Sequence, residues 1–195
     1  MKRTLLSLAA LAALLAAAPL AAGEIKGKVT CKGLRNNEDA LVYVAAIAGK
    51  TFPAPAGHVK IDQLNLTFIP HVTGVLVGTT VDFQNSDAVL HNVFSPDACA
   101  TKFNLGTWPK GESRNFTFKQ ECVATLLCKV HPEMEGFVVA VPTPYYAVTK
   151  ADGAYTIPNV PDGAYTLKVW HPKAKATQKA VTVAGTATAD FEIAK

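Results

Sequence analysis

The chain contains little methionine, cysteine or histidine, and charge of neither sign dominates it. Its 195 residues include two Met, four Cys and five His, and the formal net charge at pH 7 is +4. No cluster of Lys and Arg is present, which disfavours a nucleic-acid partner. Helix signals are also scarce, whereas short runs rich in Val, Ile, Thr and aromatic residues recur between Gly and Pro. We therefore expect an all-β protein.

The first residues have the pattern of an export signal. Lys2 and Arg3 are followed by an apolar run over residues 5–20 and by small residues at 21–23. The run of about sixteen residues is short for a membrane span, and no Cys directly follows the small residues. We expect residues 1–23 to be a cleaved signal peptide, with no transmembrane segment or lipid anchor in the mature chain. The mature protein would be periplasmic or secreted, and its net charge would fall from +4 to +2 on loss of Lys2 and Arg3.

Potential metal ligands are concentrated near the middle of the sequence. Cys128, His131 and Met134 follow one another at intervals of three residues, and His91 precedes them by about forty. A thiolate, two imidazoles and a weak axial thioether form the ligand set of a blue-copper electron-transfer site. After cleavage of the leader, Met134 is the only methionine.

The spacing of these residues suggests how they could meet. Three ligands on one short loop can surround an ion if the loop turns back on itself, and Pro132 stiffens such a turn by fixing its φ. Gly136 then allows the chain to enter a strand at residues 137–141. The remaining ligand must come from another strand, and residues 81–84 have the pattern of a strand that leads towards His91.

The stretch from about residue 57 to 142 resembles the cupredoxins, the plastocyanin-like and amicyanin-like type 1 blue copper proteins. The loop C-K-V-H-P-E-M-E-G-F-V-V at residues 128–139 is similar to the short amicyanin loop. The triplet H-N-V at 91–93 and the strand pair at 59–68 and 75–83 are similar to the segments that precede it. The resemblance implies a Greek-key β-sandwich that binds one copper ion.

The same resemblance implies the roles of individual residues. Asn92 would support the Cys128 sulfur from outside the ligand set, through its backbone or its side chain. Four residues would bind the metal, the first three in the equatorial plane and the last axially: His91, Cys128, His131 and Met134.

Each of these residues also has a simpler explanation when it is taken alone. A single Cys-x-x-His can be half of a zinc site, Cys128 could be a buried structural thiol, and His91 could be a core histidine. Zinc would require another Cys or His pair at close spacing, and an axial Met would be unusual for it. His58, His71 and His171 have no comparable neighbours, and we interpret His71 and His171 as structural.

The C-terminal part of the chain repeats a turn followed by a strand. The sequence D-G-A-Y-T-I at 152–157 recurs as D-G-A-Y-T-L at 162–167, with N-V-P between the copies. This pattern resembles the carboxypeptidase regulatory-like β-sandwich. That module usually acts as a binding element or as a spacer between domains and has no catalytic activity of its own.

That module normally begins with two strands that the C-terminal part lacks. Residues 24–30 and 40–45 have the patterns of these strands. We therefore expect a discontinuous domain of residues 24–52 and 143–195, with a cupredoxin domain of residues 57–142 inserted. Alternatively, residues 24–52 add strands to the cupredoxin.

An exported protein enters an oxidising compartment in which cysteines that bind no metal can pair. With Cys128 as a ligand, Cys31, Cys99 and Cys122 remain. If the strands near His91 and Cys128 both run away from the metal, Cys99 and Cys122 reach the same far end. We expect a Cys99–Cys122 disulfide and a free, buried Cys31, and a bridge from Cys31 to either of the others remains open.

Three functions follow from these observations. The first is a single-electron carrier between periplasmic redox proteins such as cytochromes or a dehydrogenase, with transfer through the partly exposed edge of His131. The second is a copper-binding or copper-delivery protein, or an extracytoplasmic binding module without electron transfer. Delivery sites are usually rich in Met and His, which this chain is not. A copper enzyme such as a nitrite reductase would need a further three-His site, so we expect a carrier rather than an enzyme.

Overall fold

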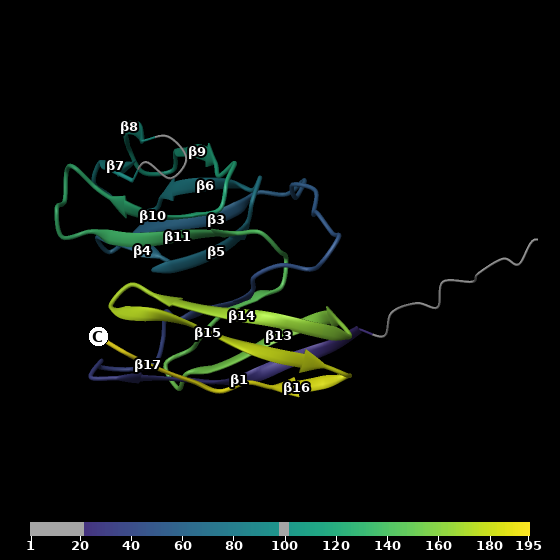
Figure 1. Cartoon of the computed structure of the whole chain (residues 1–195). Helices are drawn as coiled ribbons and strands as arrows, with labels where there is room; N and C mark the ends of the chain where they lie inside the picture. The colour runs from purple at the N-terminus through teal and green to yellow at the C-terminus, as the bar shows by residue number, and fades with distance from the viewer. Residues whose placement is uncertain (1–21, 98–101) are drawn as a thin grey trace, which may run out of the picture.

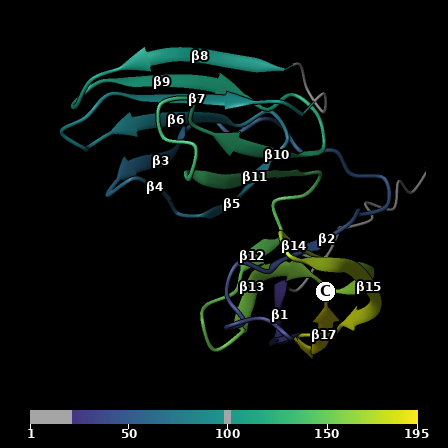
Figure 2. The ribbon, with the colours of Figure 1, turned by 90° about the vertical axis from the view of Figure 1, so that its left-hand side faces the viewer.

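The computed structural model describes residues 22–97 and 102–195. All regular structure in these two ranges is β-strand, arranged in four sheets. The sheets form two sandwiches, one above the other in Figures 1 and 2. The expected fold class, all-β with two sandwiches, is confirmed. Because the described residues form no helix, they also contain none that could cross a membrane.

The inserted sandwich, built from β3 to β11, contains the residues expected to bind metal. Its first sheet has the strand order β4 (Thr67–Ile69), β3 (Val59–Leu64), β6 (Thr80–Asn85) and β9 (Ser113–Thr117). Its second sheet has the order β5 (Val72–Leu76), β11 (Glu135–Val141), β10 (Cys122–Leu127), β7 (His91–Ser95) and β8 (Phe103–Trp108).

The core of the inserted sandwich is formed by side chains at alternate positions along its strands. Residues of β10 alternate between buried and partly exposed positions along the whole strand, as expected when one face of a strand packs inward. Val81 and Phe83 of β6 are fully buried. They belong to one cluster with Trp108, Cys128 and Met134. The two expected ligands of this cluster are therefore part of the hydrophobic core.

The terminal sandwich is built from β1, β2 and β12 to β17. One of its sheets has the order β12 (Tyr146–Val148), β2 (Leu41–Val44), β14 (Gly163–His171) and β15 (Ala174–Val183). In the other, β1 (Ala22–Lys32) pairs with β13 (Ala154–Pro161), β16 (Thr186–Thr188) and β17 (Phe191–Ala194).

The N-terminal segment supplies an inner strand to both sheets of the terminal sandwich. β1 lies between β13 on one side and β16 and β17 on the other, and β2 lies between β12 and β14. The chain leaves and re-enters this sandwich at neighbouring points, because the Val44 N–H donates to the Tyr145 carbonyl (2.9 Å) and the Thr143 hydroxyl donates to the Val44 carbonyl (2.7 Å). These pairings support the proposal that residues 24–52 and 143–195 form one domain, into which residues 57–142 are inserted.

A third hydrophobic cluster joins the two sandwiches. Phe137 and Val139 of β11 pack with Leu41 and Tyr43 of β2, while Val138 on the opposite side of β11 belongs to the core of the inserted sandwich. Six of the seven residues of β11 are buried. A strand covered on both faces has a nearly continuous apolar sequence, which explains the run F-V-V-A-V at residues 137–141.

Two features of the local structure did not follow from the sequence patterns. β8 occupies residues 103–108, for which no strand was expected, and pairs with β7. The expected strand at 75–83 is two strands, separated by a turn at Gly78, whose φ is 92°. The N-V-P segment between the two repeats forms the end of β13. The turn at Gly78 requires a left-handed conformation that glycine adopts at little cost.

Candidate metal centre

Three of the expected ligands meet where β10 ends and β7 begins. The Sγ atom of Cys128 and one ring nitrogen each of His91 and His131 lie within 4.8 Å of one another. The two Nδ1 atoms are 3.1 Å apart, and Sγ is 3.9 Å from Nδ1 of His91 and 4.0 Å from Nδ1 of His131. Within the described residues, no other cluster of three or more His, Cys, Asp or Glu side chains converges in this way.

The loop between β10 and β11 turns back on itself. The Met134 N–H donates to the His131 carbonyl at 3.0 Å, which closes a β-turn with Pro132 and Glu133 at its centre. Proline is favoured at the second position of such a turn because its φ is already set. Met134 is 1% exposed and packs in the same core cluster as Cys128. The Met134 side chain is therefore part of the core that also contains Cys128.

Asp87 orients the His91 ring, although the sequence did not lead us to expect a role for it. Oδ2 of Asp87 lies 2.8 Å from Nε2 of His91, and the carboxylate also accepts the backbone N–H groups of Asn65 (2.7 Å) and Leu66 (3.0 Å). Burial alone would raise the pKa of Asp87, but these hydrogen bonds outweigh it and lower that pKa. The available signal was a carboxylate four residues before a ligand His, a common partner for the second ring nitrogen.

Asn92 connects the Cys128 sulfur with the neighbouring strand. Its backbone N–H donates to Sγ at 3.4 Å, and its side-chain amide donates to the Gly106 carbonyl (2.6 Å) and the Asn104 side chain (2.8 Å). Its side-chain oxygen accepts the Lys129 N–H at 3.3 Å. The backbone of Asn92 therefore contacts the sulfur, while its side chain fixes the start of the loop.

The donor set fits one small metal ion. Two nitrogens about 2.0–2.1 Å from a common ion are about 3.1 Å apart when the angle at the ion is near 100°, and the two Nδ1 atoms have this separation. Nε2 of His91 is engaged by Asp87, so its Nδ1 is free to present a lone pair. A soft thiolate combined with two imidazoles suits copper better than a hard cation.

The other histidines lie apart from this cluster and have partners of their own. Nδ1 of His58 is 2.9 Å from Asp82, and Nδ1 of His71 is 2.7 Å from Asp39. His171 lies at the end of β14, and its Nε2 is 3.2 Å from the Glu38 carbonyl. These contacts agree with the structural roles expected for His71 and His171.

The remaining cysteines divide between the two sandwiches. Cys31 is a free thiol, 5% exposed, in the core of the terminal sandwich, and burial raises its pKa. Cys122 is buried at the start of β10, six residues before Cys128. Cys99 lies outside the described residues. The Cys99–Cys122 disulfide therefore stays a prediction.

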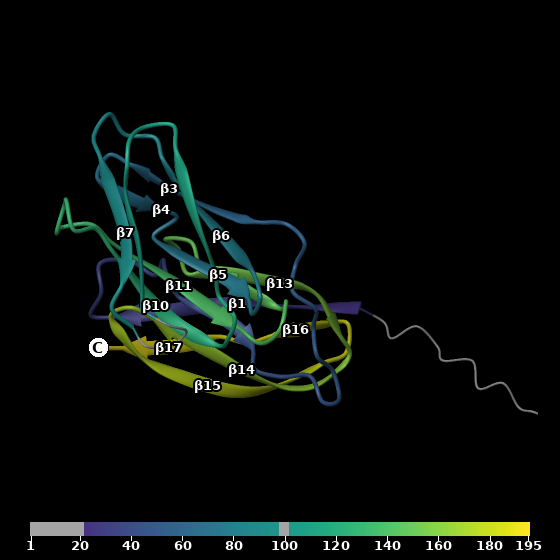
Figure 3. The same cartoon turned by 90° about the horizontal axis from the view of Figure 1, so that it is seen from above.

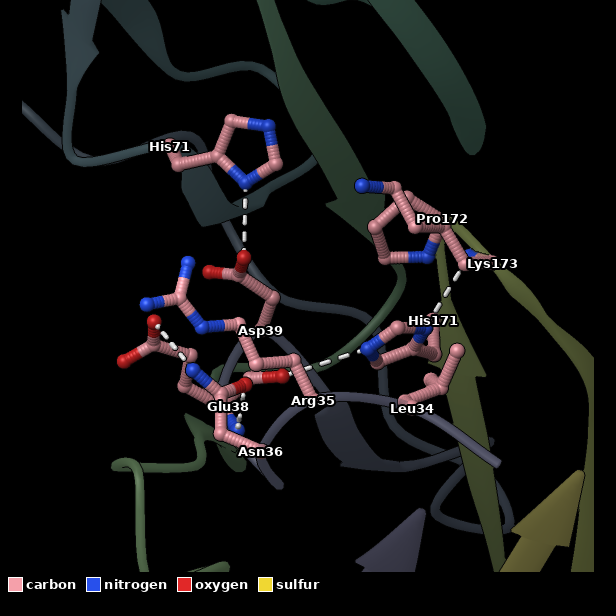
Figure 4. Close-up of a pocket in the computed structure, with 9 residues that line it drawn as sticks. All are labelled: Leu34, Arg35, Asn36, Glu38, Asp39, His71, His171, Pro172 and Lys173. Atoms are coloured by element: carbon pink, nitrogen blue, oxygen red, sulfur yellow. Dashed lines mark hydrogen bonds and ion pairs between the residues drawn. The ribbon is translucent and has the colours of Figure 1, made fainter. Parts of the chain in front are cut away.

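A hollow of about 230 Å³ lies where the two sandwiches meet. In Figure 4, the His71 ring lies above Asp39, and His171 lies on the other side of the hollow. Nδ1 of His171 accepts the Lys173 N–H at 2.9 Å, so Nε2 carries the proton and donates to the Glu38 carbonyl. Both nitrogens of His171 are thus engaged.

Comparison with known proteins identified similarities for both sandwiches. Residues 133–194 match the carboxypeptidase regulatory-like domain. The match begins ten residues before the boundary expected at 143 and so includes β11. A search of curated proteins found no match.

Three solved structures illustrate the similarity of the inserted sandwich. A purple cupredoxin from Nitrosopumilus maritimus is 27% identical, with a TM-score of 0.39, over 42% of this chain and 98% of that chain. A Cu(I) form of an amicyanin variant is 22% identical, with a TM-score of 0.41, over 51% and 97%. A copper-containing nitrite reductase from Thermus scotoductus SA-01 is 24% identical, with a TM-score of 0.42, over 51% of this chain but 25% of that one. The chain is therefore similar to cupredoxins over about half its length and matches the carboxypeptidase regulatory-like domain over residues 133–194.

Proposed function

We propose that the protein carries single electrons between redox partners through one copper ion. The ion would be held by His91, Cys128, His131 and, axially, Met134. The observation that carries this proposal is that one sulfur and two imidazole nitrogens lie within 4.8 Å of one another. The sulfur belongs to Cys128, which is part of the hydrophobic core of a β-sandwich. Copper bound by such ligands supplies a one-electron couple between Cu(I) and Cu(II).

The residues of the proposed site are held by contacts with other protein groups. His91 is fully buried and fixed by Asp87, and Cys128 is 3% exposed and accepts the Asn92 N–H. A donor set fixed in this way changes little when the charge at its centre changes by one. This rigidity supports electron transfer more than copper delivery, which requires an open and exchangeable site.

His131 provides the route by which an electron would leave the site. It is partly exposed, whereas His91 is buried. Val130, beside it in the loop, is 45% exposed, and Leu90, beside His91, is 52% exposed. Apolar side chains around a partly exposed ligand would let a partner approach closely without leaving buried charges unpaired. Periplasmic redox proteins such as cytochromes or a dehydrogenase are the partners that we propose for a periplasmic or secreted carrier.

A copper enzyme is a weaker proposal for this chain. Catalysis of nitrite reduction would require a second copper site with three His ligands. Within the described residues, His58, His71 and His171 are engaged with Asp82, Asp39 and the Glu38 carbonyl and form no such cluster.

The visible spectrum of the copper-loaded protein tests the ligand set. We expect an intense thiolate–copper band with one copper per chain and a reversible one-electron wave in voltammetry. Cys128→Ser should abolish the band. Cys31→Ser is the matched control, because Cys31 is also buried but lies in the other sandwich, and it should leave the band intact. A band that survives Cys128→Ser would exclude the proposed ligand set.

Met134→Ala separates the axial position from the other ligands. A thioether is a weak ligand that tunes the metal more than it holds it. We therefore expect the variant to retain copper and the thiolate band but to change its reduction potential. An unchanged potential would show that Met134 is only a core residue. Rapid transfer of copper from the wild type to an apo-acceptor would instead favour delivery.

A further inference from the structure

The segment that follows the metal loop is held by His71, which lies between β4 and β5 of the same sandwich. Phe137 lies three residues after Met134, and its backbone N–H donates to the His71 carbonyl at 2.8 Å. The His71 ring also packs edge-to-face on the Phe137 ring, with centroids 5.5 Å apart. His71 therefore contacts both the backbone and the side chain of the residue at which the loop re-enters the sheet.

His71 is in turn held by Asp39, which belongs to the terminal sandwich. Nδ1 of His71 lies 2.7 Å from Oδ2 of Asp39, and Figure 4 shows the two groups facing each other across the junction. Asp39 precedes β2, whereas His71 precedes β5. The contact joins segments that are 32 residues apart in sequence.

The backbone around Asp39 is fixed in an unusual conformation. Asp39 has a φ of 69°, in the left-handed region that residues other than glycine rarely adopt. The Thr149 hydroxyl donates to the Asn37 carbonyl and accepts the Ala40 N–H, so the segment is anchored on both sides of Asp39. Strain of this kind is a reason to look for a function of the side chain.

We propose that Asp39 is a positioning residue for the metal loop and acts through His71 and Phe137. The terminal sandwich is then a part of the scaffold of the metal centre rather than a spacer. The inference rests on the proposed copper site, because its consequence for the metal would be a changed environment of Met134, three residues before Phe137. Trp170 of the terminal sandwich also packs on Phe137, with centroids 5.4 Å apart, and supports the same residue.

Substitution of Asp39 can separate positioning from folding. Asp39→Gly removes the carboxylate. Glycine adopts the left-handed conformation at this position at little cost, so the substitution should introduce no backbone strain that destabilises the fold. Asp39→Asn keeps an acceptor for His71 and tolerates the same φ. The matched control is Asp82→Ala, which removes the carboxylate from another partly exposed His–Asp pair, His58–Asp82, in the inserted sandwich.

The first measurement needs no metal. In the full-length apo-protein, amide hydrogen exchange followed by NMR should be about two- to fivefold faster at Phe137 and Met134 in Asp39→Gly, the range expected for loss of one partly exposed pair. Asp39→Asn should restore most of the protection, and Asp82→Ala should leave both amides at the wild-type rate. Wild-type exchange at Phe137 in Asp39→Gly, at unchanged global stability, would overturn the proposal.

The second measurement uses the copper-loaded protein. Asp39→Gly should shift both the thiolate–copper band and the reduction potential, with Asp39→Asn intermediate and Asp82→Ala at the wild-type values. If the wild type shows no thiolate–copper band, the proposed copper site fails, while the exchange data still decide whether Asp39 positions the loop. If the wild type shows the band and Asp39→Gly matches Asp82→Ala in both properties, the positioning role is excluded.

Discussion

His91 and Asp87 form a 2.8 Å contact between Nε2 and Oδ2, on the side of the imidazole ring opposite to the Cys128 sulfur. The carboxylate is itself held by two backbone N–H groups in the turn between β3 and β4. The turn residues Asn65 and Leu66 both have positive φ, at 55° and 57°. A turn in one sheet thus fixes the ring that the other sheet presents to the metal.

The Asp87–His91 contact predicts a large effect on metal affinity. Asp87→Asn removes the negative charge that favours a ring with Nε2 protonated and Nδ1 free, and loss of such a partner usually lowers metal affinity by about 10–100-fold. Competition with a chromophoric chelator would measure the change. Asp82→Asn, which alters a carboxylate bound to His58 instead, should bind copper as the wild type does. Equal affinities for both variants would show that Asp87 does not support the site.

The His71–Asp39 pair predicts a dependence of stability on pH. The hydrogen bond that His71 donates to the Asp39 carboxylate raises the pKa of His71; burial opposes the change, Glu135 adds to it and Lys173 reduces it. A folded pKa above the unfolded value, near 6.5, means that the stabilisation is complete below about pH 6.5 and is lost as the pH rises through the folded pKa.

Urea denaturation of the wild type and of His71→Gln would test this sign. The wild-type advantage should be larger near pH 5.5 than near pH 9, by less than about 1 kcal/mol because the pair is partly exposed. Burial lowers the pKa of His171, which gives the opposite trend, but that residue is present in both proteins. An advantage that grows as the pH rises would contradict the assignment.

The two sandwiches approach each other so closely at Gly74 that a larger residue should destabilise the protein. A Cβ atom at this position of β5 would lie 2.4 Å from Cδ1 of Leu41 and 2.8 Å from Cδ2 of Tyr146, both in the terminal sandwich. Gly74→Ala should therefore cost about 1–3 kcal/mol in the free energy of unfolding, as overpacking usually does. Gly57→Ala is the control, because a Cβ there meets nothing within 4 Å. If both variants unfold at the same urea concentration, the junction is looser than the structure indicates.

Local patterns in the sequence determine much of the fold and of the ligand set. Alternation marks β10, Pro132 is visible as a turn residue, and the Cys-x-x-His-x-x-Met spacing places three donors on one loop. β8 is the exception, because the alternation that begins with Phe103 and Leu105 is interrupted at Gly106, which has a φ of 76°, and the strand lies at the edge of a sheet.

Contacts between distant segments could not be read from the sequence. Asp87 resembles any polar residue in a turn until the backbone of Asn65 and Leu66 is placed beside it. The junction is similar: Leu41 and Phe137 are both apolar residues of core strands, and only the stacking of the sheets shows that they face each other. Specific pairing of this kind depends on tertiary packing rather than on local propensity.

The proposed domain boundaries predict how fragments of the chain behave. An isolated 143–195 fragment lacks β1 and β2, the inner strands of both sheets of the terminal sandwich, and would expose unpaired edges on β13 and β14. We expect no cooperative thermal transition from this fragment by circular dichroism. Residues 24–52 joined to 143–195 by a short Gly/Ser linker should unfold cooperatively, because Val44 and Tyr145 are already hydrogen-bonded neighbours.

An isolated 57–142 fragment tests the other side of the junction. It contains all the proposed ligands, so it should bind copper, but it would expose the apolar side chains of Val72, Phe137, Val139 and Val141 that the terminal sandwich covers. An exposed patch of this kind favours association, so we expect the fragment to self-associate in sedimentation experiments and to unfold at lower urea than the full chain. Replacement of Val139, whose side chain faces the junction, by Thr should reduce association without loss of copper. Cooperative unfolding of the 143–195 fragment would refute the discontinuous domain. A 57–142 fragment as stable and as monomeric as the full chain would refute the core shared between the two sandwiches.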